Sequence, residues 1–208
     1  MLKDKSAQMR RTQGEMMKYA KFLALAATAL AALMAFAGVA SATTLTSPAG
    51  TTFTGTLKAS SSNATLTNSS TIGTIKCAKS EVEGNVTKHG TGVTVFGDIT
   101  KLTFTECTGG EPTDPVAKPG TLELHYTSGS NGTVTSSGAE VIIHKTLVGT
   151  CVFKTNNTDI GQFTGGTPAK LDIEGVIPQE SSNFFCPPNA TWSGTYTVTS
   201  PGTLLVNA

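Results

Sequence analysis

Few residues of this chain could do chemistry, and their spacing favours no reaction. Three histidines occur, His89, His125 and His144. His125 and His144 lie in strand-like sequence and could share a sheet face as a metal or acid–base pair, whereas His89 lies in a turn-like segment. The sequence contains no Gly-x-Ser-x-Gly elbow and no His-Glu-x-x-His motif. We therefore expect no catalytic residue, no metal site, no cofactor and no enzymatic activity.

Two pairs of acids are spaced two residues apart, Glu81 with Glu83 and Asp172 with Glu174. This spacing places both acids of a pair on one face of a strand. A glycosidase instead needs two acids that face each other across a cleft, about 5–9 Å apart. The pairs are more typical of a charged solvent-facing surface. A secreted hydrolase that uses these acids with the histidines is the alternative.

Trp192 and Tyr196 are the candidate ligand-binding residues, because aromatic faces can stack on the C–H surfaces of sugars. The alternative is that Trp192, the only tryptophan, packs in the core beside Cys186. A carbohydrate-binding module is therefore one candidate function, with a cell-wall or matrix polysaccharide as its partner.

The chain has four cysteines, Cys77, Cys107, Cys151 and Cys186. An even set in an exported chain predicts two disulfides. Three pairings are possible, and we favour 77–107 with 151–186 because each bridge then stays within one half. No two cysteines have the close spacing of a zinc or redox site.

Residues 1–42 have the features of a secretory signal peptide. A basic start is followed by an apolar run over 22–40 and by small residues that fit cleavage after Ala42. A start at Met16 or Met17 would give a leader of more ordinary length. A permanent anchor is the alternative, because the apolar run approaches the length that spans a bilayer.

The remaining residues, 43–208, carry nine lysines, no arginine and twelve acids, a net charge of −3. Phosphate and nucleic-acid recognition rely on arginine and on a basic surface, so no nucleic-acid partner is expected. The segment is long enough for a single domain with a core. We expect a secreted, extracellular protein that has no stable membrane insertion after cleavage of the leader. Association with the cell surface through contacts alone is one option.

Strand patterns dominate residues 43–208. Apolar and polar residues alternate at 93–96, 102–104, 122–126, 140–144, 169–173, 195–198 and 203–206. Asn131-Gly132 is the strongest hairpin signal. About ten to twelve short strands predict an all-β fold, an antiparallel β-sandwich of immunoglobulin-like or related type, with a Pro/Gly-rich loop at 109–119.

The two halves share a faint order of residues. Each reads cysteine, a glycine in one strand, a glycine in the next, an aromatic residue and a second cysteine, over 77–107 and 151–186. This order suggests a duplicated sheet unit, since glycines inside strands mark bulges or close backbone approach. Chance alignment of threonine-rich sequence is the alternative.

Several short motifs carry a family resemblance. They include Thr-Asn-Asn-Thr-Asp-Ile-Gly at 155–161 and Trp-Ser-Gly-Thr-Tyr-Thr-Val-Thr-Ser-Pro at 192–201. With Val-Glu-Gly-Asn-Val at 82–86, they resemble a large group of uncharacterised secreted, Thr/Gly-rich proteins of soil actinobacteria. The resemblance implies a bacterial extracellular protein and supplies no catalytic residues. We expect a non-enzymatic structural or binding module of the cell surface or extracellular matrix.

Overall fold

The computed structural model describes residues 42–208 except 49, 69–71, 90–93, 110–113 and 182. These residues belong to one compact unit. The expected leader, residues 1–42, lies outside the described residues apart from Ala42. In the part that is described, no helix has the length and apolar character needed to cross a membrane.

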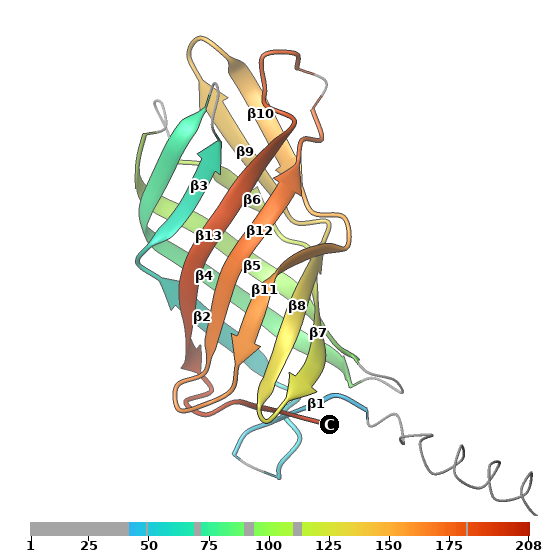
Figure 1. Cartoon of the computed structure of the whole chain (residues 1–208). Helices are drawn as coiled ribbons and strands as arrows, with labels where there is room; N and C mark the ends of the chain where they lie inside the picture. The colour runs from blue at the N-terminus through green and yellow to red at the C-terminus, as the bar shows by residue number, and fades with distance from the viewer. Residues whose placement is uncertain (1–41, 49, 69–71, 90–93, 110–113, 182) are drawn as a thin grey trace, which may run out of the picture. The chain divides into compact units, whose positions relative to one another are not determined.

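The described residues are organised as β-strands, which confirms the all-β prediction (Figure 1). The strands are β1 (Thr44–Thr46), β2 (Thr56–Ser61), β3 (Ala64–Asn68), β4 (Gly73–His89), β5 (Thr94–Thr108), β6 (Val116–Lys118), β7 (Thr121–Ser128), β8 (Asn131–Ser137), β9 (Glu140–Lys145), β10 (Gly149–Lys154), β11 (Thr158–Thr164), β12 (Lys170–Pro178), β13 (Asn189–Ser200) and β14 (Leu205–Asn207). Three of them, β4, β5 and β13, are much longer than their sequence signals because strand geometry continues through internal glycines.

The main sheet closes on itself instead of forming the expected two-sheet sandwich. Its order is β12-β11-β8-β7-β5-β4-β2-β13, and β13 pairs with β12 to complete the ring. β3 continues β2 as the second part of one broken strand, because both pair with β4 and with β13. Closure removes the exposed strand edges that the two sheets of a sandwich would have.

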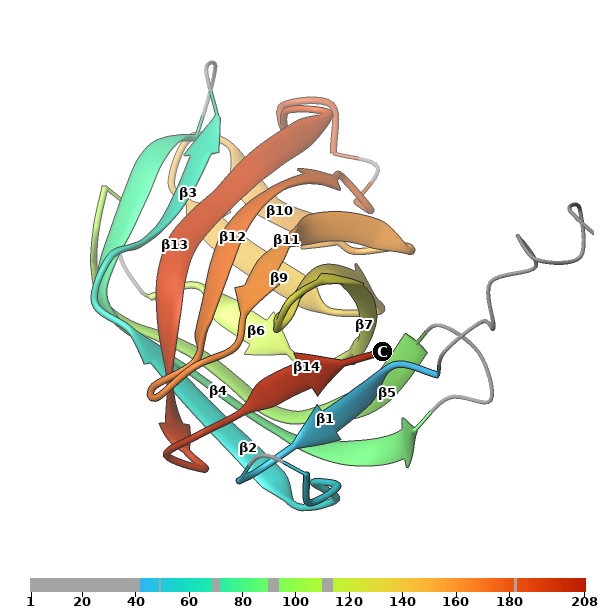
Figure 2. The same ribbon diagram turned by 60° about the horizontal axis from the view of Figure 1, so that its bottom comes forward.

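Smaller elements lie at the two ends of the closed sheet. β1 and β14 pair with each other and cross one end, as Figure 2 shows. A second sheet of order β10-β9-β6 lies toward the opposite end, at the top of Figure 1. β6 lies within the segment expected to be a loop, 109–119, where Val116 pairs with Ile142.

Local sequence explains most strands. In β13, the residues on alternate positions, Ala190, Trp192, Tyr196 and Val198, are buried, whereas most of the intervening threonines and serines are partly exposed. β7 and β8 form the expected hairpin, but its turn lies at Gly129 and residue 130, while Asn131-Gly132 already begins β8.

The two disulfides are those that the sequence analysis favoured, Cys77–Cys107 and Cys151–Cys186. The first joins directly opposed residues of the neighbouring strands β4 and β5. The second joins β10 to the loop that precedes β13. The bridges therefore differ in their structural setting, which gives the suggested duplication no support at its cysteines.

Candidate functional site

The expected aromatic platform lies inside the closed sheet. Trp192 is 5% exposed and Tyr196 is fully buried. The Trp192 ring meets Phe104 edge to face at 5.9 Å and Tyr196 at 6.0 Å. Neither residue can present its face to a sugar in this fold, so the predicted binding role is replaced by core packing.

The Tyr196 hydroxyl is held by a buried hydrogen-bond chain. Tyr196 donates to Ser80 Oγ at 2.7 Å, because Ser80 donates its own proton to the carbonyl oxygen of Thr103 at 3.0 Å. Burial raises the pKa of Tyr196 to about 12. The phenol is therefore a structural group that stays protonated at physiological pH.

This shift predicts a loss of stability at alkaline pH. Tyrosine in the unfolded chain ionises near pH 10, so the folded state keeps a proton that the unfolded state has lost. The Tyr196 contribution is fully present below pH 10 and falls by about 1.4 kcal/mol by pH 11. Urea unfolding of wild type and Tyr196→Phe at pH 9 and pH 11 measures this loss. From pH 9 to pH 11, wild type should lose about 1.4 kcal/mol of stability relative to Tyr196→Phe. An equal change in both proteins would count against the effect of burial on the Tyr196 pKa.

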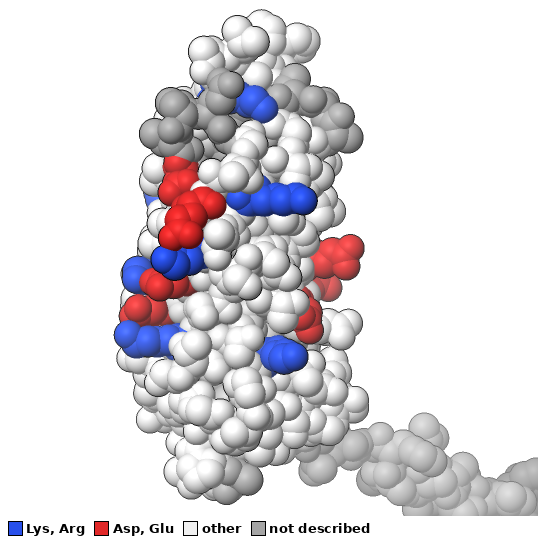
Figure 3. All heavy atoms as spheres, turned by 90° about the vertical axis from the view of Figure 1, so that its left-hand side faces the viewer, with Lys and Arg blue, Asp and Glu red and all other residues white. Residues whose placement is uncertain are grey.

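The paired acids belong to a charged outer face. Glu81 lies 2.7 Å from Lys101, and Glu83 lies 3.2 Å from Lys58. Figure 3 shows lysines and acids interleaved along this side of the molecule. The hydrogen bond from Lys101 lowers the pKa of Glu81, so this carboxylate stays charged and is unsuited to donate a proton. Exposed pairs of this kind contribute little to stability.

The second acid pair lies on the outside of β12. Asp172 accepts a hydrogen bond from Thr195 at 2.7 Å, and Asp159 of β11 lines the same open depression as Glu174. Among the residues that the structure describes, no group of three or more His, Cys, Asp or Glu is arranged to hold a metal ion.

The structure separates the histidines. His125 lies on β7 of the closed sheet, with Nε2 3.8 Å from Glu123, whereas His144 lies on β9 of the small sheet and contacts Thr150 at 3.0 Å. His89 ends β4 and contacts the Phe53 carbonyl oxygen at 2.8 Å, so it is not the solvated turn residue expected. The suggested pair of His125 and His144 on one sheet is therefore wrong.

Three large apolar side chains project from the end of the molecule that carries β9 and β10. Leu147 is 94% exposed, Phe184 93% and Phe185 65%. Leu147 lies in the turn between β9 and β10, and the two phenylalanines lie in the loop between β12 and β13. We call these three residues the apolar tip. Large apolar side chains of this kind are more often buried in a folded domain.

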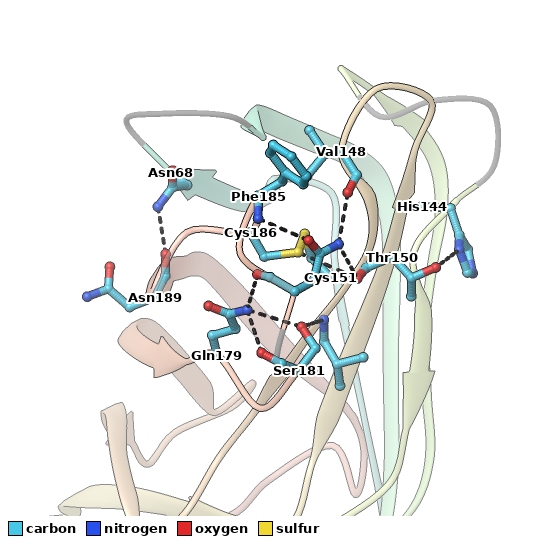
Figure 4. The surroundings of a disulfide bond; sticks show 12 residues. Asn68, His144, Val148, Thr150, Cys151, Gln179, Ser181, Phe185, Cys186 and Asn189 are labelled. Carbon is cyan, nitrogen blue, oxygen red and sulfur yellow. Dashed lines mark hydrogen bonds between the residues drawn. A yellow bond between two sulfur atoms is a disulfide. The ribbon is translucent and has the colours of Figure 1, made fainter.

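The loops of the apolar tip are held together by covalent and polar contacts (Figure 4). The Cys151–Cys186 bridge joins the phenylalanine loop to β10. Asn183 Nδ2 donates to the Val148 carbonyl oxygen at 2.8 Å, and its Oδ1 accepts from the Phe185 N–H at 3.0 Å. The disulfide and these hydrogen bonds thus connect the loop that carries the phenylalanines to β10 and to the turn that carries Leu147.

A second polar side chain braces the base of the phenylalanine loop. The Gln179 amide donates to the carbonyl oxygen of Asn183 at 2.9 Å and also to Ser181. The Ser181 hydroxyl in turn accepts the N–H of Val152 in β10 at 3.3 Å. These contacts give hydrogen-bond partners to backbone N–H and C=O groups of the loop that would otherwise depend on water.

Sequence reasoning did not single out this tip. Phe184 and Phe185 are adjacent and are followed by Cys186 and two prolines. Two consecutive large apolar residues cannot both point inward from a strand, and the prolines end strand pairing. That arrangement is the signal that could have identified an exposed aromatic loop.

An apolar cavity of about 100 Å³ lies inside the closed sheet. Its wall is almost entirely hydrocarbon, and all eight strands of the ring contribute residues to it.

Comparison with known proteins gives no relative for this chain. No protein-family model, no curated protein and no solved structure matches it. The resemblance to secreted actinobacterial proteins therefore stays a prediction, and the site must be interpreted from its own geometry.

Proposed function

We propose that this protein is a secreted, non-enzymatic module of the cell surface or extracellular matrix, and that it attaches to its partner through the apolar tip. The observation that carries the proposal is the exposure of Leu147, Phe184 and Phe185 together at one end. The two disulfides fit an oxidising, extracellular compartment.

The contacts that hold the two tip loops together support the proposal that the tip is an attachment surface. Because the disulfide and the Asn183 contacts already hold the loops together, binding loses less conformational entropy than it would with free loops. Covering one large apolar side chain contributes about 1.5–3 kcal/mol when it is fully removed from water. Three such groups are enough for a measurable, reversible attachment.

The charge near the tip supports a partner that is apolar and neutral or anionic. Residues 142–151 and 183–189 contain Lys145 and His144 but no aspartate or glutamate, and the one acid of the loop between β12 and β13, Glu180, lies 3.6 Å from Lys154. The rest of the mature chain is acidic overall. The ammonium group of Lys154 offsets the charge of Glu180. A lipid-bearing surface is the partner that fits this chemistry best.

A carbohydrate-binding function is the second candidate, and the phenylalanine pair favours it. The rings of Phe184 and Phe185 lie edge to face at 6.0 Å and are both exposed. They offer aromatic faces for sugar C–H surfaces, the role that sequence analysis had given to Trp192 and Tyr196. A cell-wall or matrix polysaccharide would be the partner in this case.

Co-sedimentation tests the proposal and separates these partners. Purified protein is mixed either with phosphatidylglycerol–phosphatidylcholine vesicles or with insoluble peptidoglycan and cellulose. The test variant carries Leu147→Ser, Phe184→Ser and Phe185→Ser. We expect wild type to pellet with the vesicles and the test variant to bind at least tenfold more weakly, because its tip has lost the apolar contact area.

The matched control is Val176→Ser, which removes an exposed apolar side chain from β12 and leaves the tip intact. It should bind as wild type does. Tip-dependent pelleting with the polysaccharides alone would assign the second candidate. Equal binding by wild type and the tip variant on every surface would refute the role of the tip.

A further inference from the structure

The apolar cavity is separate from the tip and has a chemistry of its own. We propose that it is a binding site for a small, uncharged hydrocarbon group. The site adds a ligand to the proposed function and does not depend on it, because no residue of the tip lines the cavity.

A small side chain, Ala59, leaves room in the wall of the cavity. Ala59 of β2 is buried and points inward, between Leu57 and Ser61 on the same face. Gly84 and Gly97 line the wall where β4 and β5 pair across bulges, and a Cβ at Gly84 would lie only 2.9 Å from the Asp98 carbonyl oxygen of the opposite strand. Leu45 and Leu204 lie at the wall near the end that β1 and β14 cross.

The few polar side chains of the wall are engaged elsewhere. The Tyr196 hydroxyl is hydrogen-bonded to Ser80, and Asn85 accepts a hydrogen bond from Thr56 at 2.7 Å. Asp98, which also belongs to the lining, is exposed to solvent. A water inside needs two to four polar partners, so this cavity favours hydrocarbon over water.

Size and chemistry together define the ligand class. A dry apolar cavity of about 150 Å³ in another protein accepts benzene or xenon, and the present cavity of about 100 Å³ is of the same order. No buried charge or unpaired donor in the wall calls for a polar group on the ligand. The group bound is therefore a short hydrocarbon, either a free small molecule or the end of a longer aliphatic chain.

Thermal unfolding with three probes tests this site: xenon and benzene as free hydrocarbon-like ligands, and octan-1-ol as a chain end. A ligand at about ten times its dissociation constant should raise the Tm of wild type by about 3–6 °C. Benzene or xenon alone would indicate a free small ligand, and octan-1-ol alone a chain end. No shift with any probe would overturn the proposal.

Ala59→Leu is the variant that fills the site. Its larger side chain occupies the cavity, so the shift in Tm should fall below about 1 °C. Methyl NMR of wild type gives a second readout that needs no variant. The probe should move the signals of Leu57, Val82 and Leu124, which line the cavity, and not those of Leu66 in the other part of the core.

The tip variant keeps the two proposals apart. The serine substitutions at the apolar tip should leave the response to benzene unchanged, since none of them reaches the cavity. If wild type binds surfaces but shows no shift in Tm with any probe, the cavity site is refuted and the role of the tip is not. A full response to the probe that survives Ala59→Leu would place the ligand elsewhere and also refute it.

Discussion

Replacement of Trp192 by alanine is expected to lower the free energy of unfolding by about 3–5 kcal/mol. The indole is buried in contact with Phe104 and Tyr196, so its removal leaves a cavity in the core. For a domain whose total stability is about 5–15 kcal/mol, this is a large fraction. Chemical denaturation followed by circular dichroism measures it.

The same substitution separates a core residue from a binding residue. Val176→Ala, at an exposed position on β12, is the control and should change stability by less than about 1 kcal/mol. If Trp192 were instead a sugar-stacking residue, the alanine variant would keep nearly full stability and lose binding to a polysaccharide. That pattern would contradict the packing described for β13.

Loss of the Cys151–Cys186 bridge is expected to cost about 3.5–4 kcal/mol in the chain-entropy model, because its cysteines are 35 residues apart. The double variant Cys151→Ser/Cys186→Ser should also bind surfaces more weakly. The bridge joins the phenylalanine loop to β10, and without it the binding step must order that loop. Denaturation and co-sedimentation measure the two effects.

The other bridge supplies a matched control. Cys77 and Cys107 are 30 residues apart, so the variant Cys77→Ser/Cys107→Ser should lose a similar amount of stability. Its bridge joins β4 to β5 and holds no tip residue, so attachment should persist under conditions where both variants are folded. Equal loss of attachment in both would mean that the tip depends on global stability and not on local bracing.

The alternation of apolar and polar residues predicted the fold class well. In β12, Ile173 and Ile177 are buried, whereas Asp172 and Glu174 on either side of Ile173 are exposed, as expected for alternation between the two faces of a sheet. The disulfide pairing also followed from the sequence, because each bridge stays within one half of the chain.

Closure of the sheet could not be predicted in this way. Alternation shows which residues point inward, and this is the same for a sandwich and for a ring. The ring depends on pairings such as that of Lys170 with Thr197 between β12 and β13. Those residues carry no signal that selects one partner strand over another.

The candidate site was misplaced for a related reason. Trp192 and Tyr196 have the chemistry of a binding platform, but they share the inward face of β13 with Ala190 and Val198. Phe184 and Phe185, in contrast, are of a residue type that is usually buried, and both are exposed. The position of an aromatic residue relative to strand alternation was therefore more informative than its type.

The most direct test of attachment through the apolar tip is the location of the mature protein in fractionated cultures of its native host. Wild type and the variant with serine at Leu147, Phe184 and Phe185 are expressed at equal levels, and washed cells, matrix and medium are assayed separately. Wild type is expected to stay with the cells or the matrix, and the variant is expected to move to the medium. Wild type found free in the medium, or both proteins retained equally, would contradict attachment through the apolar tip.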